Sequence, residues 1–350
     1  MASTKVLLTG ATGFIGGSVL NQILSSGNPK IKELSVTAIV RKEEQVDLLT
    51  EHAINARLFN SLDDSKQLRE IASEFDIVLH CATGLHTSSA EALILGLGDS
   101  QKKTGRQTYY IHTTGTSNLA YSSLSRPDAQ IRNWSDADGD VFEGELRRHA
   151  EQKYDQRVTD VVVVNTAEKT GVNAYLMMPP TVYGRGLGFF NKQSIQLPFV
   201  IRCAIEAGHP EYLGDGSGGV GYVHIEDLAQ LYELLLAKVL EGADIPFNRK
   251  GIYFSNTGEF VWGDLVKRVG EIGVQLNALK SAEPVHISLD EAERKWERPR
   301  LFLETNFAGK SKTTPKVAYA LGWKPAHNDK DWDDEIVETW KAVLAQDRKE

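Results

Sequence analysis

The sequence has few of the features that mark secreted, zinc-binding or membrane proteins. It holds only two cysteines in 350 residues, Cys81 and Cys203, which excludes both a disulfide framework and a zinc site with four thiolates. Its longest apolar runs, such as residues 161–164 and 234–237, are far too short to span a bilayer. No apolar signal region follows Met1, so we expect a cytoplasmic protein with reduced cysteines.

Positive charge is scarce relative to negative charge. The chain carries 39 Lys and Arg residues against 47 Asp and Glu residues, which gives a net charge of -8. Such a surface repels phosphate backbones and anionic lipid, so we expect neither a nucleic acid nor a membrane as partner. Hydrophobic residues make up 41% and charged residues 25%. This mixture is typical of a globular protein with a sizeable core, and it excludes a disordered, collagenous or coiled-coil chain.

Short apolar segments alternate with helical patterns in the first half of the chain. Continuous apolar runs indicate strands that are buried on both faces, and helices between the strands indicate a parallel sheet. The expected strands are residues 5–9, 36–40, 56–59, 77–81, 108–112 and 174–178. The sequence therefore predicts an α/β fold built on a doubly wound parallel Rossmann sheet.

The character of the sequence changes after Pro179 and Pro180. A glycine-rich, irregular stretch follows, and the tail is helical, charged and rich in tryptophan. We predict a Rossmann domain at residues 1–183 and a smaller C-terminal domain at residues 184–350. Segments near residues 220–256 are expected to return to the Rossmann sheet.

Three glycines, Gly10, Gly13 and Gly16, stand between the first expected strand and an amphipathic helix. Gly10 permits a tight turn, Gly13 lets the backbone approach a pyrophosphate, and Gly16 lets the helix pack close to the sheet. The N-terminus of such a helix offers unpaired N–H groups and a positive dipole end to phosphates. This context predicts a dinucleotide site rather than a plain tight turn.

Longer motifs carry a resemblance to a known family. The segment Thr9-Gly-Ala-Thr-Gly-Phe-Ile-Gly16 resembles the signature of the extended short-chain dehydrogenase/reductases, which include the NAD-dependent epimerases and dehydratases. Further matches cover nearly the whole chain: Asp76-Ile-Val-Leu-His80-Cys-Ala82, Tyr110-Ile-His-Thr-Thr-Gly-Thr116, Pro180-Thr-Val-Tyr-Gly184, Tyr222-Val-His-Ile-Glu-Asp227 and Ala320-Leu-Gly-Trp-Lys-Pro325. Residues 185–198 and 260–264 are similar to a fungal epimerase-like group. The resemblance implies that the domain at residues 1–183 binds NAD(P) and that the domain at residues 184–350 mainly binds a small-molecule substrate, and it allows a homodimer.

The end of the second expected strand decides between NAD and NADP. In this fold an acidic residue there binds the adenosine ribose and selects NAD. Arg41 and Lys42 stand there instead, where a 2′-phosphate would meet two cations; a solvated basic turn is the alternative. We therefore predict NADP, with NAD less favoured, and we place Ser61 and Leu62 beside the adenine. The resemblance implies further cofactor contacts from Thr12, Phe14, Ile15, Cys81, Ala82, Thr83, Thr113, Pro180, Thr181 and Val182.

A strand end supplies the first candidates for catalysis. Family members use a Ser or Thr hydroxyl there together with a Tyr-x-x-x-Lys pair on one helix, and the tyrosine exchanges a proton. Gly115 aligns with the usual serine, so its neighbours Thr114 and Thr116 are the candidate hydroxyl groups. The alternative is that both threonines only end the strand.

The Tyr-x-x-x-Lys pair is missing. Counting back from the following strand places the tyrosine near Gln152 and the lysine near Gln156. Tyr154 and Arg157 stand close by and are the candidate replacements, with Arg157 as a cation for the ribose, although arginine is a poor proton donor. An ion pair between Arg157 and Asp160 on an exposed helix face is the alternative.

Three residues are predicted near the substrate: His86, Tyr183 and Phe190. His86 follows the strand expected to face the nicotinamide and can exchange a proton near neutral pH, unless it is an ordinary loop histidine. Val220 stands where nucleotide-sugar enzymes of this family usually carry an arginine, which favours a smaller or more apolar substrate. The nine histidines show no metal-ligand spacing, so no metal is expected.

These observations favour an NAD(P)-dependent oxidoreductase or epimerase-like enzyme that acts on a small carbonyl or hydroxyl compound with non-standard acid and base groups. A regulator that senses NADP without turnover is the main alternative, because the tyrosine and lysine positions are degenerate. An isomerase with a structural dinucleotide is the third reading.

Overall fold

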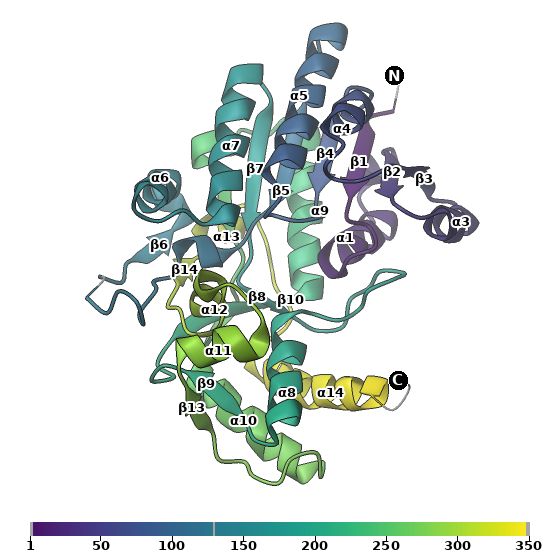
Figure 1. Ribbon diagram of the computed structural model, residues 1–350. Coiled ribbons are helices and arrows are strands. Elements are labelled where there is room, and N and C mark those ends of the chain that lie inside the picture. The colour runs from purple at the N-terminus through teal and green to yellow at the C-terminus, as the bar shows by residue number, and fades with distance from the viewer. Residues whose placement is uncertain (1–2, 129, 348–350) are drawn as a thin grey trace.

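The centre of the structure is a parallel sheet of seven strands with helices on both faces (Figure 1). The computed structural model describes residues 3–128 and 130–347. The strand order of this sheet is β3-β2-β1-β4-β5-β7-β11, and every neighbouring pair is parallel. The strands are β1 (Lys5–Thr9), β2 (Ser35–Val40), β3 (Asn55–Leu58), β4 (Ile77–His80), β5 (Tyr109–Thr113), β7 (Asn173–Met178) and β11 (Ile252–Phe254). The predicted doubly wound Rossmann sheet is confirmed.

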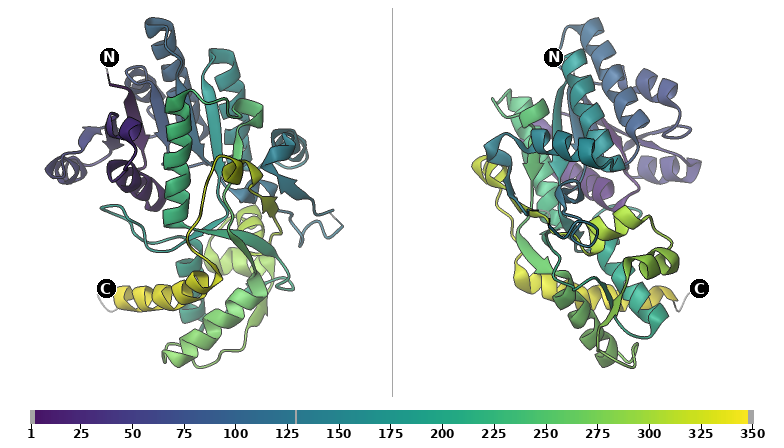
Figure 2. Two further views of the ribbon diagram at one scale, coloured as in Figure 1. Left: turned by 180° about the vertical axis from the view of Figure 1, so that it is seen from behind. Right: turned by 60° about the vertical axis from the view of Figure 1, so that its left-hand side comes forward.

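Two apolar cores, one on each face of the sheet, explain why its strands read as continuous hydrophobic runs. In β1, Val6 and Leu8 belong to one core and Leu7 to the other, since successive side chains of a strand point to opposite faces. The first core includes the buried faces of α1 and α9 (Figure 2), and the second those of α4, α5 and α7. These helices are α1 (Phe14–Leu24), α4 (Ser65–Ala72), α5 (Thr87–Thr104), α7 (Asp155–Thr170) and α9 (Ile225–Glu241).

A second lobe lies at the carboxyl ends of the sheet strands and has its own core. There β10 pairs with β8 and β12 in a three-stranded sheet. Trp332 stacks on Tyr222 with 4.8 Å between the ring centroids, and Trp262 and Trp340 are buried. The elements of this lobe are β8 (Thr181–Tyr183), α8 (Gln196–Ala207), β9 (Glu211–Leu213), β10 (Gly219–His224), β12 (Gly258–Val261), α10 (Trp262–Gln275), β13 (Val285–Ile287), α11 (Leu289–Trp296), α12 (Arg300–Phe307) and α14 (Asp329–Asp347).

The chain passes between the lobes more than once. β11 extends the sheet beside β7, and α9 packs against α1, whereas β10 belongs to the three-stranded sheet. Of the stretch near 220–256, the helix and the last strand therefore lie on the Rossmann sheet and the first strand does not. The remaining elements are α2 (Pro29–Lys32), α3 (Glu43–Glu51), η1 (Thr116–Leu119), β6 (Asn133–Ser135), η2 (Asp136–Asp138), α6 (Val141–Glu151), η3 (Asn248–Lys250), β14 (Lys312–Thr314) and α13 (Lys316–Ala320).

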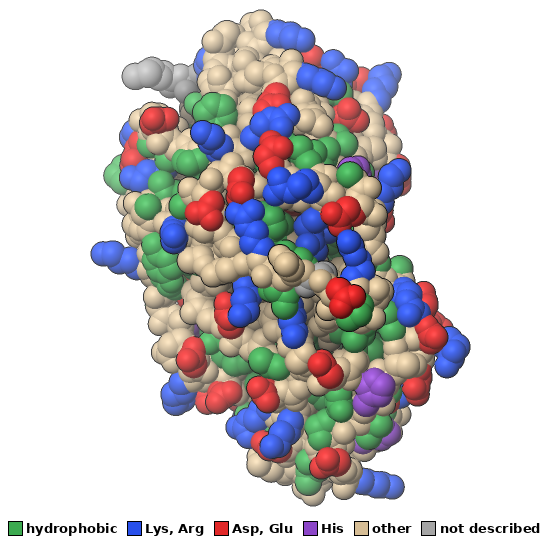
Figure 3. Space-filling view, turned by 90° about the vertical axis from the view of Figure 1, so that its left-hand side faces the viewer, with side chains coloured by type: hydrophobic (Ala, Val, Ile, Leu, Met, Phe, Trp, Pro, Cys, Tyr) green, Lys and Arg blue, Asp and Glu red, His purple; other side chains and the backbone are tan. Residues whose placement is uncertain are grey.

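One face of the molecule mixes both signs of charge (Figure 3). Figure 3 shows the face that carries α6, where Lys and Arg side chains are interspersed with Asp and Glu side chains. None of the helices described within residues 3–128 and 130–347 is both long and apolar enough to cross a membrane.

Asp227, in the first turn of α9, ties the tail of the chain to the Rossmann sheet. Its side chain is fully buried and accepts hydrogen bonds from the backbone N–H groups of Ala326 and His327, at 2.7 and 3.1 Å. Its backbone carbonyl accepts a hydrogen bond from Nε1 of Trp323 at 2.9 Å. The segment held in this way leads directly into α14 of the second lobe.

We predict that Asp227→Ala lowers the free energy of unfolding by about 2–4 kcal/mol, because two backbone N–H donors lose a buried, charged acceptor. Asp244→Ala, at an exposed acid just beyond the same helix, is the control and should change that free energy by less than about 0.5 kcal/mol. Chemical denaturation of both variants measures the difference. Equal stabilities would show that Asp227 does not anchor the tail.

Candidate active site

The turn between β1 and α1 contains two positions where no side chain fits. Gly10 has a φ of +79°, and a Cβ there would stand 2.6 Å from the backbone of Cys81. A Cβ on Gly16 would stand 2.3 Å from the carbonyl oxygen of Gly10. A Cβ on Gly13 would meet only that same oxygen, at 3.2 Å, so the space outside Gly13 is left open for another group.

This turn fits the pyrophosphate of a dinucleotide. Gly13 is the N-cap of α1, and no side chain caps the first turn. The first N–H groups of the helix and the positive end of its dipole therefore face the open space beside Gly13. Thr12, half-buried in the turn, accepts a hydrogen bond at its carbonyl from the backbone N–H of Asn191 at 3.3 Å. The loop at residues 184–195 thus folds back over the turn.

The residues expected to select the cofactor lie at the ends of neighbouring strands. Arg41 and Lys42 are exposed and follow β2. Nζ of Lys42 lies 3.4 Å from Oε1 of Glu44, so Lys42 is shared with a carboxylate. Ser61 and Leu62 follow β3, where Oγ of Ser61 accepts a hydrogen bond within the turn and Leu62 packs on the core.

The residues after β4 complete this edge of the sheet. Cys81, Ala82 and Thr83 are half-buried, and the backbone of Cys81 lies against Gly10. Burial raises the pKa of the Cys81 thiol to about 11, so the thiol stays protonated at neutral pH and behaves as a small apolar group.

A cavity of about 210 Å³ opens at the carboxyl ends of β5 and β7. Its walls come from the start of α1, the segments that follow β5 and β7, the first turn of α7, and the second lobe. The lining residues are Phe14, Ile15, Thr114, Gly115, Thr116, Ser117, Gln156, Pro179, Pro180, Thr181, Val182, Ile195, Gln196, Val220, Phe302, Thr305 and Asn306. Within the described part of the chain, none of these side chains is charged or titrates near neutral pH.

Seven of the expected site residues meet in this cavity. Five of them are predicted to contact the cofactor and two are predicted to be catalytic, and the cavity brings the five and the two together. They are Phe14, Ile15, Thr114, Thr116, Pro180, Thr181 and Val182. Thr113 is not among them, because its hydroxyl is buried on the other side of the strand and lies 2.6 Å from the hydroxyl of Tyr232 in α9.

Gln156 occupies the position counted for the lysine. Its Oε1 accepts a hydrogen bond from the hydroxyl of Ser117 at 2.9 Å, and its Nε2 donates to Oγ1 of Thr114 at 3.3 Å. A Cβ on Gly115 would stand 2.8 Å from Nε2 of Gln156, so the missing side chain at residue 115 makes room for this amide. Register counting pointed to Gln156, but only the structure identifies it as a lining residue.

Tyr154 reaches the cavity through a second side chain. It is the N-cap of α7, and its hydroxyl donates to Oγ of Ser117 at 3.2 Å and accepts from Nδ2 of Asn306 at 3.3 Å. Because α6 ends at Glu151 and α7 begins at Asp155, the chain has no continuous helix across the expected tyrosine and lysine positions. Asn306 carries no sequence signal, since it comes from α12 in the second lobe.

Arg157 does not take the place of the lysine. Its guanidinium is buried and donates to the backbone carbonyl of Asn118, at 2.7 and 3.1 Å, and to that of Gln152 at 2.9 Å. One residue beyond Gln156, the helix has turned by about 100° and points Arg157 away from the cavity. The exposed pair with Asp160 is wrong as well, since both side chains are buried. Burial lowers the pKa of Arg157 to about 10.

A buried polar network lies behind Thr114. Its hydroxyl donates to Oδ2 of Asp160 at 2.7 Å. Nδ2 of Asn118 donates to the same oxygen at 2.7 Å and to Oε1 of Glu145 at 2.8 Å. Burial raises the pKa of Glu145 to about 7 and that of Asp160 well above its ordinary value.

The structure does not bring the three expected substrate residues to the cavity. His86 caps α5, and its Nε2 lies 3.0 Å from Oδ1 of Asp63, on the side of β3. Tyr183 is buried in the aromatic core of the second lobe, edge-on to Trp332. Phe190 lines a separate hollow of about 730 Å³ between the loop at residues 184–195 and α14.

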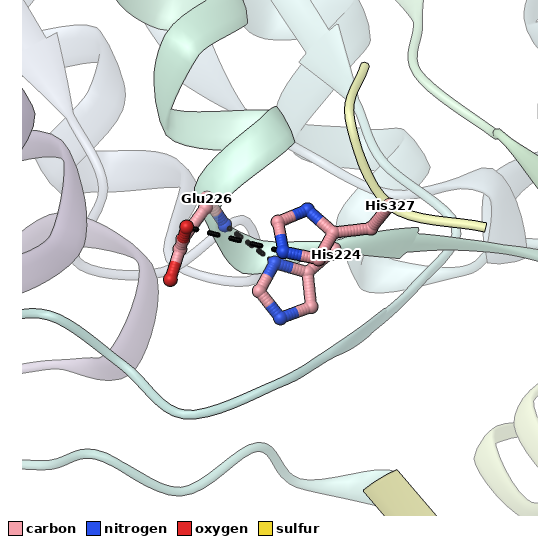
Figure 4. A group of neighbouring side chains, drawn as sticks. All are labelled: His224, Glu226 and His327. Atoms are coloured by element: carbon pink, nitrogen blue, oxygen red, sulfur yellow. Dashed lines mark hydrogen bonds and ion pairs between the residues drawn. The ribbon is translucent and has the colours of Figure 1, made fainter. Parts of the chain in front are cut away.

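Among the described residues, His224, Glu226 and His327 form a group whose spacing could hold a metal ion (Figure 4). The two imidazole rings stack, with centroids 3.5 Å apart and planes at 19°. Stacked rings direct their lone pairs side by side, whereas a metal needs lone pairs that converge on one point about 2 Å away. Nδ1 of His327 instead pairs with Oδ2 of Asp227 at 3.1 Å. The group therefore holds the tail against α9.

Known proteins resemble this chain over most of its length. The model of the NAD dependent epimerase/dehydratase family matches residues 6–248. The Oxidase ucsJ of Acremonium sp is 26% identical over 338 residues, which is 92% of each chain. A dTDP-4-dehydro-6-deoxy-D-allose reductase from a Streptomyces species is 25% identical over 236 residues, 65% of this chain and 71% of the reductase.

Solved structures show the same fold. A dTDP-glucose 4,6-dehydratase from Streptomyces venezuelae, solved with NAD, superimposes with a TM-score of 0.65 and 14% identity over 99% of this chain and 98% of the dehydratase. Vestitone reductase from alfalfa gives a TM-score of 0.59 and 16% identity over 97% of this chain and 98% of the reductase.

We predict that two glycine substitutions in the turn affect different properties, one dinucleotide binding and the other stability. Gly13→Val should fold and lose dinucleotide binding, because its Cβ meets only the oxygen of Gly10 and its methyl groups extend from there into the space that a phosphate needs. Gly16→Ala should lower the free energy of unfolding by more than about 3 kcal/mol, because its Cβ overlaps backbone that cannot move away. Thermal unfolding and calorimetric titration with NADP+ measure the two effects. Wild-type affinity in Gly13→Val would exclude this turn as the phosphate site.

Proposed function

Because the chain belongs to the NAD dependent epimerase/dehydratase family, we propose that it is an NADP(H)-dependent oxidoreductase or epimerase-like enzyme for a small, uncharged carbonyl or hydroxyl compound. The observation that carries this proposal is the cavity at the ends of β5 and β7, whose lining in the described chain is entirely neutral. We keep the cytoplasm as the proposed compartment.

The cofactor part of the proposal rests on the turn and on the end of β2. Gly10, Gly13 and the first turn of α1 would hold the pyrophosphate. Arg41, and to a lesser degree Lys42, would bind a 2′-phosphate, since no carboxylate ends this strand. When bound, the nicotinamide would supply or accept a hydride at the substrate carbon.

The substrate part rests on the size and chemistry of the cavity. A volume of about 210 Å³ leaves little room for a nucleotide sugar beside a nicotinamide, and Val220 lines the cavity where an arginine would be expected to clamp a pyrophosphate. Thr114, Ser117 and Asn306 offer hydrogen bonds to a carbonyl oxygen, while the apolar residues exclude water. A charged substrate would lose its hydration there without finding an opposite charge. Two of the similar proteins are an oxidase and a reductase, which favours a redox step.

One observation favours a second function. The amide of Gln156 stands where a lysine is expected and neither donates nor accepts a proton in a reaction step. A cavity without a titratable lining suits a protein that binds NADP and senses its redox state. The two functions differ in turnover.

A screen for NADPH oxidation decides between them. We expect steady turnover of one or more small neutral aldehydes or ketones, and at least tenfold lower kcat/KM for keto acids of the same size. Thr114→Val should lower kcat and leave the Kd of NADPH unchanged, because the hydroxyl is at the reaction end of the cavity. Tight NADPH binding without turnover of any compound would favour the sensor.

We predict that NADP+ binds more tightly than NAD+. Arg41→Ala should weaken NADP+ binding about tenfold or more and leave NAD+ binding unchanged, because one charge-assisted contact to the 2′-phosphate is lost. Lys42→Ala should have a smaller effect, since Glu44 already shares its charge. Lys267→Ala, at an exposed lysine of α10, is the matched control. Calorimetric titration of all four proteins with both cofactors measures these affinities, and a wild-type preference for NAD+ would contradict the assignment.

A further inference from the structure

Two carboxyl groups are enclosed beside the cavity but do not line it. Glu145 belongs to α6 and Asp160 to α7, and neither side chain has exposed surface. The amide of Asn118 donates to both, at 2.8 Å to Oε1 of Glu145 and at 2.7 Å to Oδ2 of Asp160. One amide group therefore holds the two carboxyl groups next to each other.

Two oxygens of this carboxyl pair lack a hydrogen-bond donor. Oδ1 of Asp160 and Oε2 of Glu145 are buried and have no hydrogen-bond partner in the described part of the chain. Two ionised carboxylates in contact repel each other, and a buried acceptor without a donor is destabilising. One proton held between them removes both problems, because a protonated carboxyl group is a donor. Their raised pKa values agree with this arrangement.

The groups around the pair come from three elements. Arg148 of α6 and Arg157 of α7 are the nearby cations, but their guanidinium groups donate to backbone carbonyls. From β5, Nε2 of His112 lies 3.6 Å from Oδ1 of Asp160, and burial lowers the pKa of His112 so that it is neutral. Tyr110 lies beside His112, and burial raises its pKa. With one proton the pair carries one negative charge, and the positive charges of Arg148 and Arg157 stabilise the second negative charge that appears when the proton leaves.

Thr114 connects the pair to the cavity. Its Oγ1 donates to Oδ2 of Asp160 at 2.7 Å, and the residue lines the cavity. From the cavity side, the amide of Gln156 makes only a long contact with the same Oγ1, at 3.3 Å. A ligand oxygen that replaces this amide meets the hydroxyl of Thr114 with Asp160 directly behind it.

We propose that Asp160 and Glu145 share one proton, and that Thr114 passes it to the oxygen of a substrate bound in the cavity. The proposal rests on the proposed function, since it needs a substrate oxygen that gains negative charge. It supplies an acid for a cavity whose described lining has none.

In a reduction, the proton moves from the carboxyl pair through Thr114 to the substrate oxygen. The carbonyl carbon gains a hydride, with its two electrons, from a reduced nicotinamide dinucleotide, and the carbonyl oxygen becomes negative. A half-turn of the Asp160 carboxyl group first brings its protonated oxygen, Oδ1, to Oγ1 of Thr114, whose hydroxyl hydrogen leaves Oδ2 and turns to the substrate oxygen. The Oγ1–H bond of Thr114 then breaks toward that oxygen while a new Oγ1–H bond forms with the proton from Asp160. The product is an alcohol, and the carboxyl pair is left with one proton fewer. After the alcohol leaves, water in the cavity returns the proton through Thr114.

Infrared titration of the full chain tests the shared proton without a substrate. We expect the carbonyl stretch of a protonated carboxyl group at neutral pH, lost at alkaline pH. The double variant Glu145→Gln, Asp160→Asn should lack the band. Asp136→Asn, at a separate buried acid whose pKa burial raises to about 6, should keep it. Thr114→Val should shift the band, because the carboxyl group loses its partner, and Thr114→Ser should leave it in place.

Three results would overturn the proposal. They are the absence of the band in the wild type at neutral pH, its presence in the double variant, and an unchanged band frequency in Thr114→Val. If the double variant does not fold, the two Thr114 variants decide the question.

The pH profile of turnover separates this proposal from the proposed function. With NADPH and the best neutral carbonyl compound of the screen, kcat should fall as the pH rises into the alkaline range where the pair loses its shared proton, because burial raises the pKa of both carboxyl groups. Glu145→Gln should move or abolish that fall and leave the Kd of NADPH unchanged, whereas Tyr154→Phe should keep the profile. The reverse pattern would assign the proton to Tyr154 and contradict the proposal. If no compound turns over, the proposed function fails and the infrared result alone decides the pair.

Discussion

The N-terminal end of α1 reaches the carboxyl ends of β1 and β4 because Gly10 and Gly16 have no side chains. With a Cβ at either residue, atoms would stand 2.3–2.6 Å apart and the helix would have to move outward. The close approach places the first turn of α1 beside an open space for a phosphate. It also sets Phe14 and Ile15 against the segments that follow β5 and β7, where they form one wall of the cavity. The cofactor site and the cavity thus depend on the same contact.

The opposite wall has lost its charges. The break between α6 and α7 contains Gln152, at the position counted for the tyrosine of the family. Gln156, at the position counted for the lysine, lies in the first turn of α7 and fills the space above Gly115. Every change replaces a group that exchanges protons with one that only hydrogen-bonds. Any acid must then act through a hydroxyl of the lining, and Thr114 is the hydroxyl with a buried carboxyl group behind it.

Local patterns in the sequence predict the sheet, the glycine turn and the strand ends, because each of these depends on residues close together in the chain. Local patterns do not fix the direction of a single helical side chain, because a one-residue difference in register turns that side chain by about 100°. The prediction that Arg157 faces the cofactor is wrong for this reason. The position of His86 after its strand predicts a side chain near the substrate, but the imidazole pairs with Asp63, which follows β3 and lies away from the cavity. The link from Thr114 to Glu145 and Asp160 joins residues from separate elements. No periodicity or motif reports such a contact before the chain is folded.

A crystal structure of the chain with NADP+ tests the central claim most directly, namely that the turn and the cavity form one cofactor and substrate site. We expect the pyrophosphate at the N-terminal end of α1, the 2′-phosphate beside Arg41, and the nicotinamide end in the cavity next to Thr114. A dinucleotide bound elsewhere, or one whose nicotinamide end points away from Thr114 and Gln156, would contradict the account.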